Sequence, residues 1–261
     1  MHPDHLATLH AWFEGYSRSF LRGDARKDGP LVLKIDHTHR VRSNMRLLAQ
    51  SIGYADSHLC LAEAVGLLHD VGRFEQYHRY GTFNDSRSVN HAALGIEVIE
   101  QAGILDDLAN DEHGLIVEAV RFHNAATLPD DRPPLSLAFM RLIRDADKLD
   151  IWKVFGDYYR SGLSLEVAII PHLTNQPVWE AAILEDILQK RMAKFSAMRS
   201  INDFKLLQLS WVFDLNFPET FLQAQKRGDL AAIAGSLPDA PAVNRAVAVV
   251  MTQLDEMGGQ A

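Results

Sequence analysis

The chain has 261 residues, 47% of them hydrophobic, which is enough for one sizeable core or for a core with an appended subdomain. Its formal net charge is −8, which argues against a protein that binds nucleic-acid polymers, because such proteins are usually basic. A single cysteine excludes an intramolecular disulfide. With no recognisable signal peptide or membrane span, the sequence predicts a cytoplasmic protein without a membrane partner.

Apolar residues at helical spacing begin early in the chain. Residues 37–53 (HTHRVRSNMRLLAQSIG) place apolar side chains at positions i, i+4, i+7 and i+11, and Gly53 supplies a stop. Residues 57–71 form a second apolar stripe, with Ser57 as the expected N-cap and Gly72 as the expected end. These two segments are predicted helices.

Polar residues then interrupt the pattern. Residues 72–87 are expected to form a loop, because the segment is polar and contains glycine. Further helices are expected after Ser88, over residues 113–123 and after Pro134. Beyond residue 160 the pattern stays helical, and no alternating strands are recognisable. The sequence predicts one all-α domain over residues 1–261, with a core at about 30–155 and a C-terminal helical extension at about 160–261.

Histidines and aspartates lie beside the apolar stripes, on or at the ends of separate predicted helices. These residues are His37, His69, Asp70, His91, His123 and Asp147. Imidazole and carboxylate groups are the usual ligands of borderline divalent metals. Helices that surround one interior can bring such groups together, as they do in helical di-metal proteins.

Three motifs make a family resemblance specific. They are HTHRV from His37, LLHDVG around His69 and Asp70, and RDADKL around Asp147. Together they resemble the HD-domain metallohydrolase superfamily, over roughly residues 30–155. The resemblance implies an HD-domain helical bundle in which His37, His69, Asp70 and Asp147 bind metal and Asp70 bridges two ions.

Some branches of this superfamily add two histidines between the His-Asp pair and the last aspartate. His91 in SVNHAALG and His123 in VRFHN stand where those histidines would fall. The resemblance therefore implies two divalent metal ions, and the ligand types accept Mn, Fe, Zn, Co or Ni. A mononuclear site, with His91 and His123 serving the substrate instead, is the alternative.

Two acids compete for the role of the last metal ligand. Asp145 and Asp147 lie on different sides of one predicted helix. Asp147 has apolar neighbours on its side, whereas Asp145 is flanked by basic residues and is expected to be solvated or salt-bridged. Because a carboxylate in apolar surroundings is costly unless it is paired or metal-bound, Asp147 is the predicted ligand.

The resemblance implies a metal-dependent phosphohydrolase that uses metal-activated water on a small phosphate ester, such as a nucleotide. Asp70 and Arg73 are the predicted catalytic residues, and Arg73 stands where many HD proteins carry a lysine. The predicted substrate contacts are Arg73, Arg87, Asn90 and Asn124, and residues 79–87 are a predicted lid.

Two other functions fit the same pattern. A few HD proteins with six such ligands hold a mixed-valent di-iron pair and use dioxygen to cleave C–C or C–P bonds. A non-catalytic HD module that senses a ligand is the other alternative. A homo-oligomer is compatible with all three functions.

Overall fold

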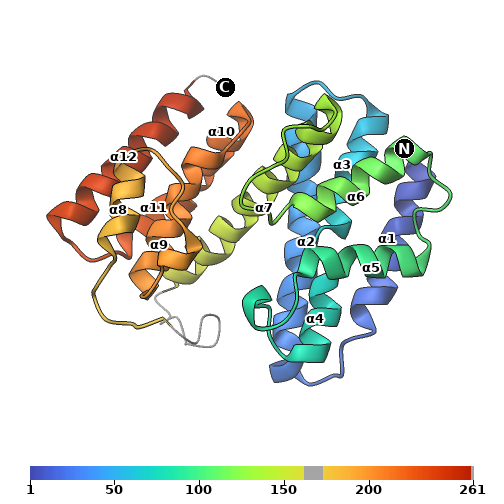
Figure 1. Cartoon of the computed structure of the whole chain (residues 1–261), viewed down its shortest axis with the longest axis horizontal. Helices are drawn as coiled ribbons and strands as arrows, with labels where there is room; N and C mark the ends of the chain where they lie inside the picture. The colour runs from blue at the N-terminus through green and yellow to red at the C-terminus, as the bar shows by residue number, and fades with distance from the viewer. Residues whose placement is uncertain (162–172, 260–261) are drawn as a thin grey trace. The chain divides into compact units, whose positions relative to one another are not determined.

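The computed structural model describes residues 1–161 and 173–259, and these residues form helices and connecting segments without a β-strand (Figure 1). The all-α prediction is confirmed. The chain divides into two compact units, Met1–Asp147 and Lys148–Ala261. This division falls inside one continuous helix, α7 (Pro134–Arg160), rather than in a linker. The single domain with a core at residues 30–155 stays a prediction.

Unit 1 holds the residues that the sequence singled out. Its elements are α1 (Pro3–Arg18), α2 (Ala25–Ser51), α3 (Asp56–Leu68), α4 (Gly72–Tyr80), the 3₁₀ helix η1 (Asp85–Arg87), α5 (His91–Ala102), α6 (Asn110–Phe122) and the first half of α7. None of the described helices of the chain is both long and apolar enough to cross a membrane.

The close packing of α2 against α3 forms the centre of unit 1. Apolar residues of both helices are fully buried there, among them Val41, Met45 and Val65. Gly66 permits the approach, because a Cβ at this position would lie 2.8 Å from the Cα of Arg42. The distance between the two helices therefore depends on the absence of a side chain at residue 66.

Helix α4 replaces part of the loop that was predicted over residues 72–87. Its polar surface is stabilised locally, because Arg79 donates to Glu75 across one turn at 2.6 Å. Phe74 and Gln76 are buried, and Gly81 ends the helix with a φ of 64°. The prediction of a loop was wrong here because the aromatic rings that cover Phe74 come from α1, a distant part of the chain.

The ends of the neighbouring helices also differ from the sequence expectation. Helix α3 has Ala55 rather than Ser57 at its N-cap. Gly72 opens α4 rather than ending α3, and it lacks a side chain because a Cβ would overlap the backbone carbonyl of His91 on α5. Helix α5 begins at His91 with Asn90, not Ser88, as its N-cap. Only three residues therefore connect α3 to α4.

Unit 2 is a second helical body. Its elements are the remainder of α7, α8 (Ala181–Leu188), η2 (Phe195–Ala197), α9 (Ile201–Ser210), η3 (Trp211–Asp214), α10 (Pro218–Arg227), α11 (Asp229–Gly235) and α12 (Pro241–Gly258). Buried Trp152 donates its indole N–H to the carbonyl of Gln208 at 2.9 Å. Among the described residues of this unit, no three potential metal ligands come together.

Replacing Gly66 by alanine tests the helix contact. Because the added methyl group meets backbone rather than a flexible side chain, we expect Gly66→Ala to destabilise unit 1 by about 1–3 kcal/mol in urea unfolding. Gly114→Ala is the matched control, since Gly114 also lies inside a helix but has open space around it. That control should be neutral or more stable by up to about 1 kcal/mol, and equal stability losses in both variants would contradict the interpretation.

Candidate metal centre

Five helical segments bring the six candidate ligands to one place in unit 1. His37 lies on α2, and the His69–Asp70 pair lies in the connection between α3 and α4. His91 is the first residue of α5, His123 caps the C-terminal end of α6, and Asp147 lies on α7. The four histidines and Asp70 are all buried.

Asp70 lies between two groups of ligands and presents one carboxylate oxygen to each. Its Oδ2 lies 3.6 Å from His37 Nε2 and 3.7 Å from His69 Nε2. Its Oδ1 lies 3.3 Å from His91 Nε2 and 3.7 Å from His123 Nε2. Each group meets the spacing of a metal site, and the two groups share only Asp70.

Asp147 extends the first group. Its Oδ1 lies 3.1 Å from His37 Nε2 and 4.0 Å from His69 Nε2. The sequence analysis expected Asp145 to be solvated or salt-bridged. The structure excludes the solvated alternative, because Asp145 is fully buried, whereas the side chain of Asp147 is 23% exposed. Asp147 thus lies beside the histidines, although not for the reason that the helix pattern gave.

Hydrogen bonds to the outer ring nitrogens orient three of the histidines. The Nδ1–H of His69 donates to the carbonyl of Gly66 at 2.8 Å, and that of His123 donates to Val120 at 2.7 Å. His91 Nδ1 lies 2.7 Å from the carboxylate of Asp85. Since these partners accept hydrogen bonds, the proton belongs on Nδ1, and each Nε2 presents a lone pair to the centre.

The geometry of His91 and His123 fits a bound cation. Their Nε2 atoms lie 2.9 Å apart, and both lone pairs are directed inward. Two neutral imidazoles with protons on Nδ1 cannot hydrogen-bond to each other through Nε2, so this arrangement favours a positive charge between them. Nitrogen and carboxylate oxygen are the donors that divalent transition metals take, and the residues present fit such an ion.

Burial sets the charges of the centre. It lowers the pKa of His69 to about 3, so this imidazole is neutral at neutral pH. Burial would raise the pKa of Asp70, but the positive charge of Lys34 holds it well below its ordinary value. For Asp147 a hydrogen bond from His37 likewise outweighs burial and lowers the pKa. The centre therefore combines the neutral imidazole of His69 with the ionised carboxylates of Asp70 and Asp147.

Arg73, a predicted catalytic and substrate-binding residue, lies under the segment that follows α4. Its guanidinium donates to Gln76 Oε1 at 2.9 Å and to Asp85 Oδ1 at 2.8 Å, and its Nε lies 3.4 Å from Asp70 Oδ1. It also donates to the carbonyl of Phe83. The side chain thus connects Asp70 to Asp85, the residue that orients His91.

Two functional candidates escaped the sequence analysis. Lys34 donates to Asp70 Oδ2 at 2.7 Å from α2, one turn before His37, and its position at i−3 from that histidine was an available signal. Asp85 accepts from His91, Arg73 and Gln76, but it follows a polar turn and no periodic pattern marks it. Burial would raise the pKa of Asp85, yet these bonds hold it below its ordinary range.

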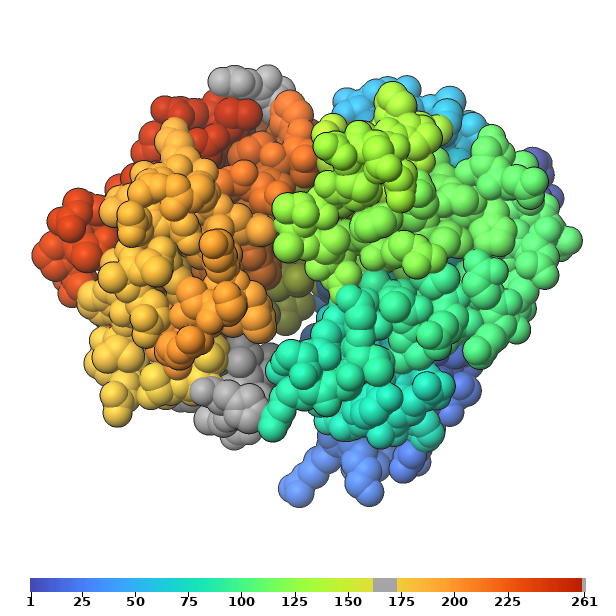
Figure 2. Space-filling model, in the orientation of Figure 1, coloured from blue at the N-terminus to red at the C-terminus, as the bar shows by residue number. Residues whose placement is uncertain are grey.

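The remaining predicted substrate contacts surround the second histidine group. Asn90 and Asn124 are exposed, and Asn124 Nδ2 lies 3.3 Å from Asp85 Oδ2. Arg87 is exposed on η1. Figure 2 shows that the turquoise segment, to which α4 belongs, reaches the surface of this face. Residues 79–87 comprise the end of α4, a turn and η1, and their role as a lid stays a prediction.

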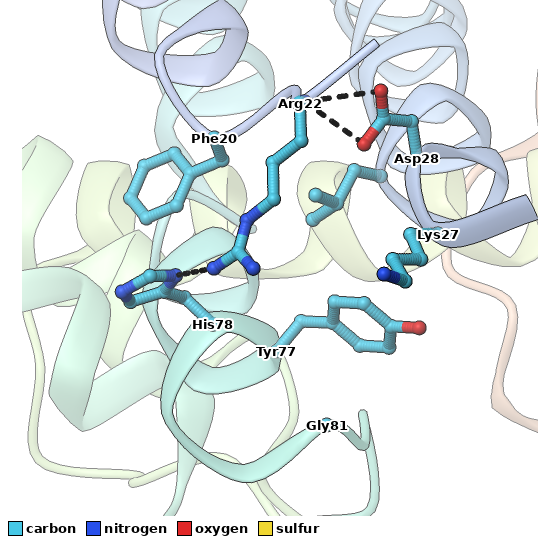
Figure 3. Close-up of a pocket in the computed structure, with 8 residues that line it drawn as sticks. Phe20, Arg22, Lys27, Asp28, Tyr77, His78 and Gly81 are labelled. Carbon is cyan, nitrogen blue, oxygen red and sulfur yellow. Dashed lines mark hydrogen bonds between the residues drawn. The ribbon is translucent and has the colours of Figure 1, made fainter. Parts of the chain in front are cut away.

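A separate pocket of about 190 Å³ lies at the N-terminal end of α2 (Figure 3). Its lining includes Phe20, Arg22, Lys27, Tyr77, His78 and Gly81. The guanidinium of Arg22 points to the ring of His78, and its backbone N–H donates to Asp28. None of the six candidate ligands lines this pocket, so it is distinct from the metal centre.

Comparison with known proteins agrees with the geometry of unit 1. Residues 35–152 match the family model of the HD domain, in agreement with the superfamily that the sequence motifs resemble. The matched range includes all six candidate ligands. No curated protein and no solved structure showed significant similarity to the chain.

Replacing Asp85 by asparagine tests its support of His91. The variant removes the charge that fixes the Nδ1 proton of His91, so we expect affinity for divalent metal to fall about 10–100-fold in competition with a chromophoric chelator. Asp131→Asn is the control, because Asp131 is an exposed aspartate that also pairs with an arginine, Arg132. Unchanged affinity in Asp85→Asn would contradict an orienting role.

Buried His69 makes the stability of the metal-free protein depend on pH. Its folded-state pKa is about 3, and the unfolded value is near 6.5. As the pH falls below 6.5, His69 becomes protonated in the unfolded chain but stays neutral in the folded protein. The free energy of unfolding therefore decreases by up to about 1.4 kcal/mol per pH unit. The lowered carboxyl pKa values act mainly below about pH 5, and burial also lowers the pKa of His39. Urea unfolding in chelator between about pH 6.5 and 5 therefore reports the histidines, and comparison with a His69 variant separates the part due to His69.

His69→Gln should flatten this dependence, because the variant has no imidazole to protonate. His113→Ala should keep the wild-type slope, since His113 is only partly buried and lies outside the centre. An unchanged slope in His69→Gln would show that other groups cause the pH dependence.

Proposed function

We propose that this protein is a metal-dependent phosphohydrolase that cleaves a small phosphate ester, such as a nucleotide, with two divalent metal ions. One observation carries the proposal: the two oxygens of Asp70 are directed at two separate histidine groups. The HD domain over residues 35–152 supports the same class of reaction.

The ligand roles follow from this arrangement. His37, His69 and Asp147 would hold one ion together with Asp70 Oδ2, while His91 and His123 would hold the other with Asp70 Oδ1. When bound, such ions lower the pKa of a coordinated water molecule, so that hydroxide is available near neutral pH, and they offset the negative charge of a phosphoryl group. The bonds of Gly66, Val120 and Asp85 to the outer ring nitrogens keep the imidazoles in the ligating tautomer.

Lys34 is the side chain we assign to the phosphoryl oxygens. Its ammonium group lies 2.7 Å from Asp70 and its side chain is 20% exposed, so it can reach a substrate at the edge of the centre. Arg73 is engaged by Gln76, Asp85 and the carbonyl of Phe83, which favours Lys34 over Arg73 as the first contact. Arg73 then acts mainly by holding Asp70 and Asp85 in place.

Exposed polar groups near His91 complete the proposed substrate site. Asn124 and Asn90 offer amides beside the second ligand group, and Arg87 offers a positive charge on η1. Hydrolysis would consume one water molecule and yield a phosphate and an alcohol, with cleavage of a P–O bond. The small set of cations fits a phosphate ester rather than a long polyanion.

The first experiment measures metal content and hydrolysis together. Protein purified without chelator should hold at least two metal ions per chain, and His91→Ala with His123→Ala should lower the ratio by one or two. The manganese- or iron-loaded protein is then screened on phosphomonoesters, phosphodiesters and nucleotides. We expect hydrolysis of at least one class, with kcat/KM lowered about 10²-fold or more by Lys34→Met. His113→Ala is the control that should retain both metal and activity.

Three outcomes would overturn the proposal. No hydrolysis of any phosphate ester by the fully loaded protein would contradict a phosphohydrolase. A mixed-valent EPR signal after anaerobic iron loading, accompanied by substrate-dependent oxygen uptake, would assign the same six ligands to an oxygenase. A ratio of one metal in both proteins would make His91 and His123 substrate contacts in a mononuclear site.

A further inference from the structure

A third group of potential ligands lies outside the candidate metal centre. We propose that His10, Glu14 and His39 form a second transition-metal site, which binds a divalent ion such as Zn²⁺ and joins α1 to α2. One donor atom of each residue lies within 4.8 Å of the donors of the other two. The proposed hydrolase reaction does not use these residues, so the site is independent of that function.

Two helices supply the three donors. His10 and Glu14 are four residues apart on α1, so their side chains lie on one face, one above the other. His39 comes from α2, and its Nε2 lies 2.9 Å from Glu14 Oε1. The rings of His10 and His39 have their centroids 5.7 Å apart. The tertiary packing of α1 against α2 brings the three donors together, since the spacing of these residues in the sequence does not predict their contact.

The site is separate from the HD centre, even though α2 contributes to both. His37 and His39 are two residues apart, so at about 100° per residue they project on nearly opposite sides of the helix. His37 is buried beside Asp70, whereas the side chain of His39 is 32% exposed beside α1. All of α1 precedes the HD match at residues 35–152, so two of the three ligands lie outside the matched range.

Neighbouring side chains hold the ligands in position. The fully buried ring of Phe13 meets the imidazole of His39 edge-on, with centroids 5.6 Å apart. Arg18 Nε donates to Glu14 Oε2 at 2.9 Å, which leaves Oε1 directed at His39. Such contacts lower the entropy lost when ligands are fixed around an ion, in the way that outer contacts orient ligands in known metal sites.

The donor set selects the class of ion. Two imidazole nitrogens and one carboxylate oxygen suit Zn²⁺, Co²⁺, Ni²⁺ or Cu²⁺, whereas Mg²⁺ and Ca²⁺ prefer oxygen ligands. Three protein ligands at a partly exposed position leave room for water to complete the coordination. We therefore expect zinc rather than magnesium to bind here, and we expect it to stabilise the contact between α1 and α2.

The test compares zinc content across matched variants of the full chain. Each protein is equilibrated with buffered Zn²⁺, and zinc per chain is measured by elemental analysis. His10→Ala and Glu14→Gln should each hold about one ion fewer than the wild type, since each loses one of three ligands. His113→Ala is the matched control, because His113 also pairs with a glutamate, Glu100, at 3.2 Å but is not part of any three-ligand group among the described residues.

Thermal unfolding supplies a second readout. Because an ion that binds only the folded protein raises its stability, Zn²⁺ should raise the midpoint of the wild type more than that of His10→Ala. The same difference should persist when His91 and His123 are both replaced by alanine, which separates this site from the HD centre. His10 and Glu14 are partly exposed, so we expect helix content by circular dichroism to be unchanged in both variants.

The proposal is overturned if His10→Ala and Glu14→Gln retain the wild-type zinc ratio and the wild-type midpoint shift. It is also overturned if His113→Ala loses as much zinc as they do, because zinc would then bind to single exposed histidines. The same comparison is made with Mg²⁺ in place of Zn²⁺. If the two variants also hold about one Mg²⁺ fewer than the wild type, the selectivity for zinc that the donor set implies is excluded.

Discussion

The buried carboxylate of Asp70 is the constraint on which unit 1 depends. An ionised carboxylate at 3% exposure is costly unless positive or hydrogen-bonding groups surround it, and Lys34, Arg73 and imidazoles from separate helices do so. Helix α3 therefore has to stop at Leu68, just before the His-Asp pair, and α5 has to begin at His91. The short connection between α3 and α4 places Asp70 where every one of these helices can reach it.

The helices that the sequence predicted are those whose apolar residues recur at a helical period. For α2, α3, α6 and α7 the pattern of apolar residues in the sequence indicates which face of the helix is buried. Helix α4 was not predictable in this way, because most of its residues are polar and the rings that cover Phe74 come from the distant helix α1. The family match confirms the HD domain, while the boundary of the C-terminal extension stays a prediction.

Motifs predicted the six residues that converge, because a histidine or aspartate at the end of an apolar stripe faces the interior. They could not reveal Asp85, whose importance arises from where a turn brings it against His91. The helix pattern could not decide whether Asp145 is solvated or salt-bridged, since the residues beside it on α7 do not determine which side of that helix other elements cover. Proximity between distant segments is the information that a single sequence lacks.

Gly66 has two roles in the structure. Its missing side chain lets α3 approach Arg42 on α2, and its carbonyl accepts the Nδ1 proton of His69. The separation of the two helices and the aim of a candidate ligand are thus set by the same peptide unit. A motion that widens the gap between α2 and α3 would therefore also displace the carbonyl that orients His69.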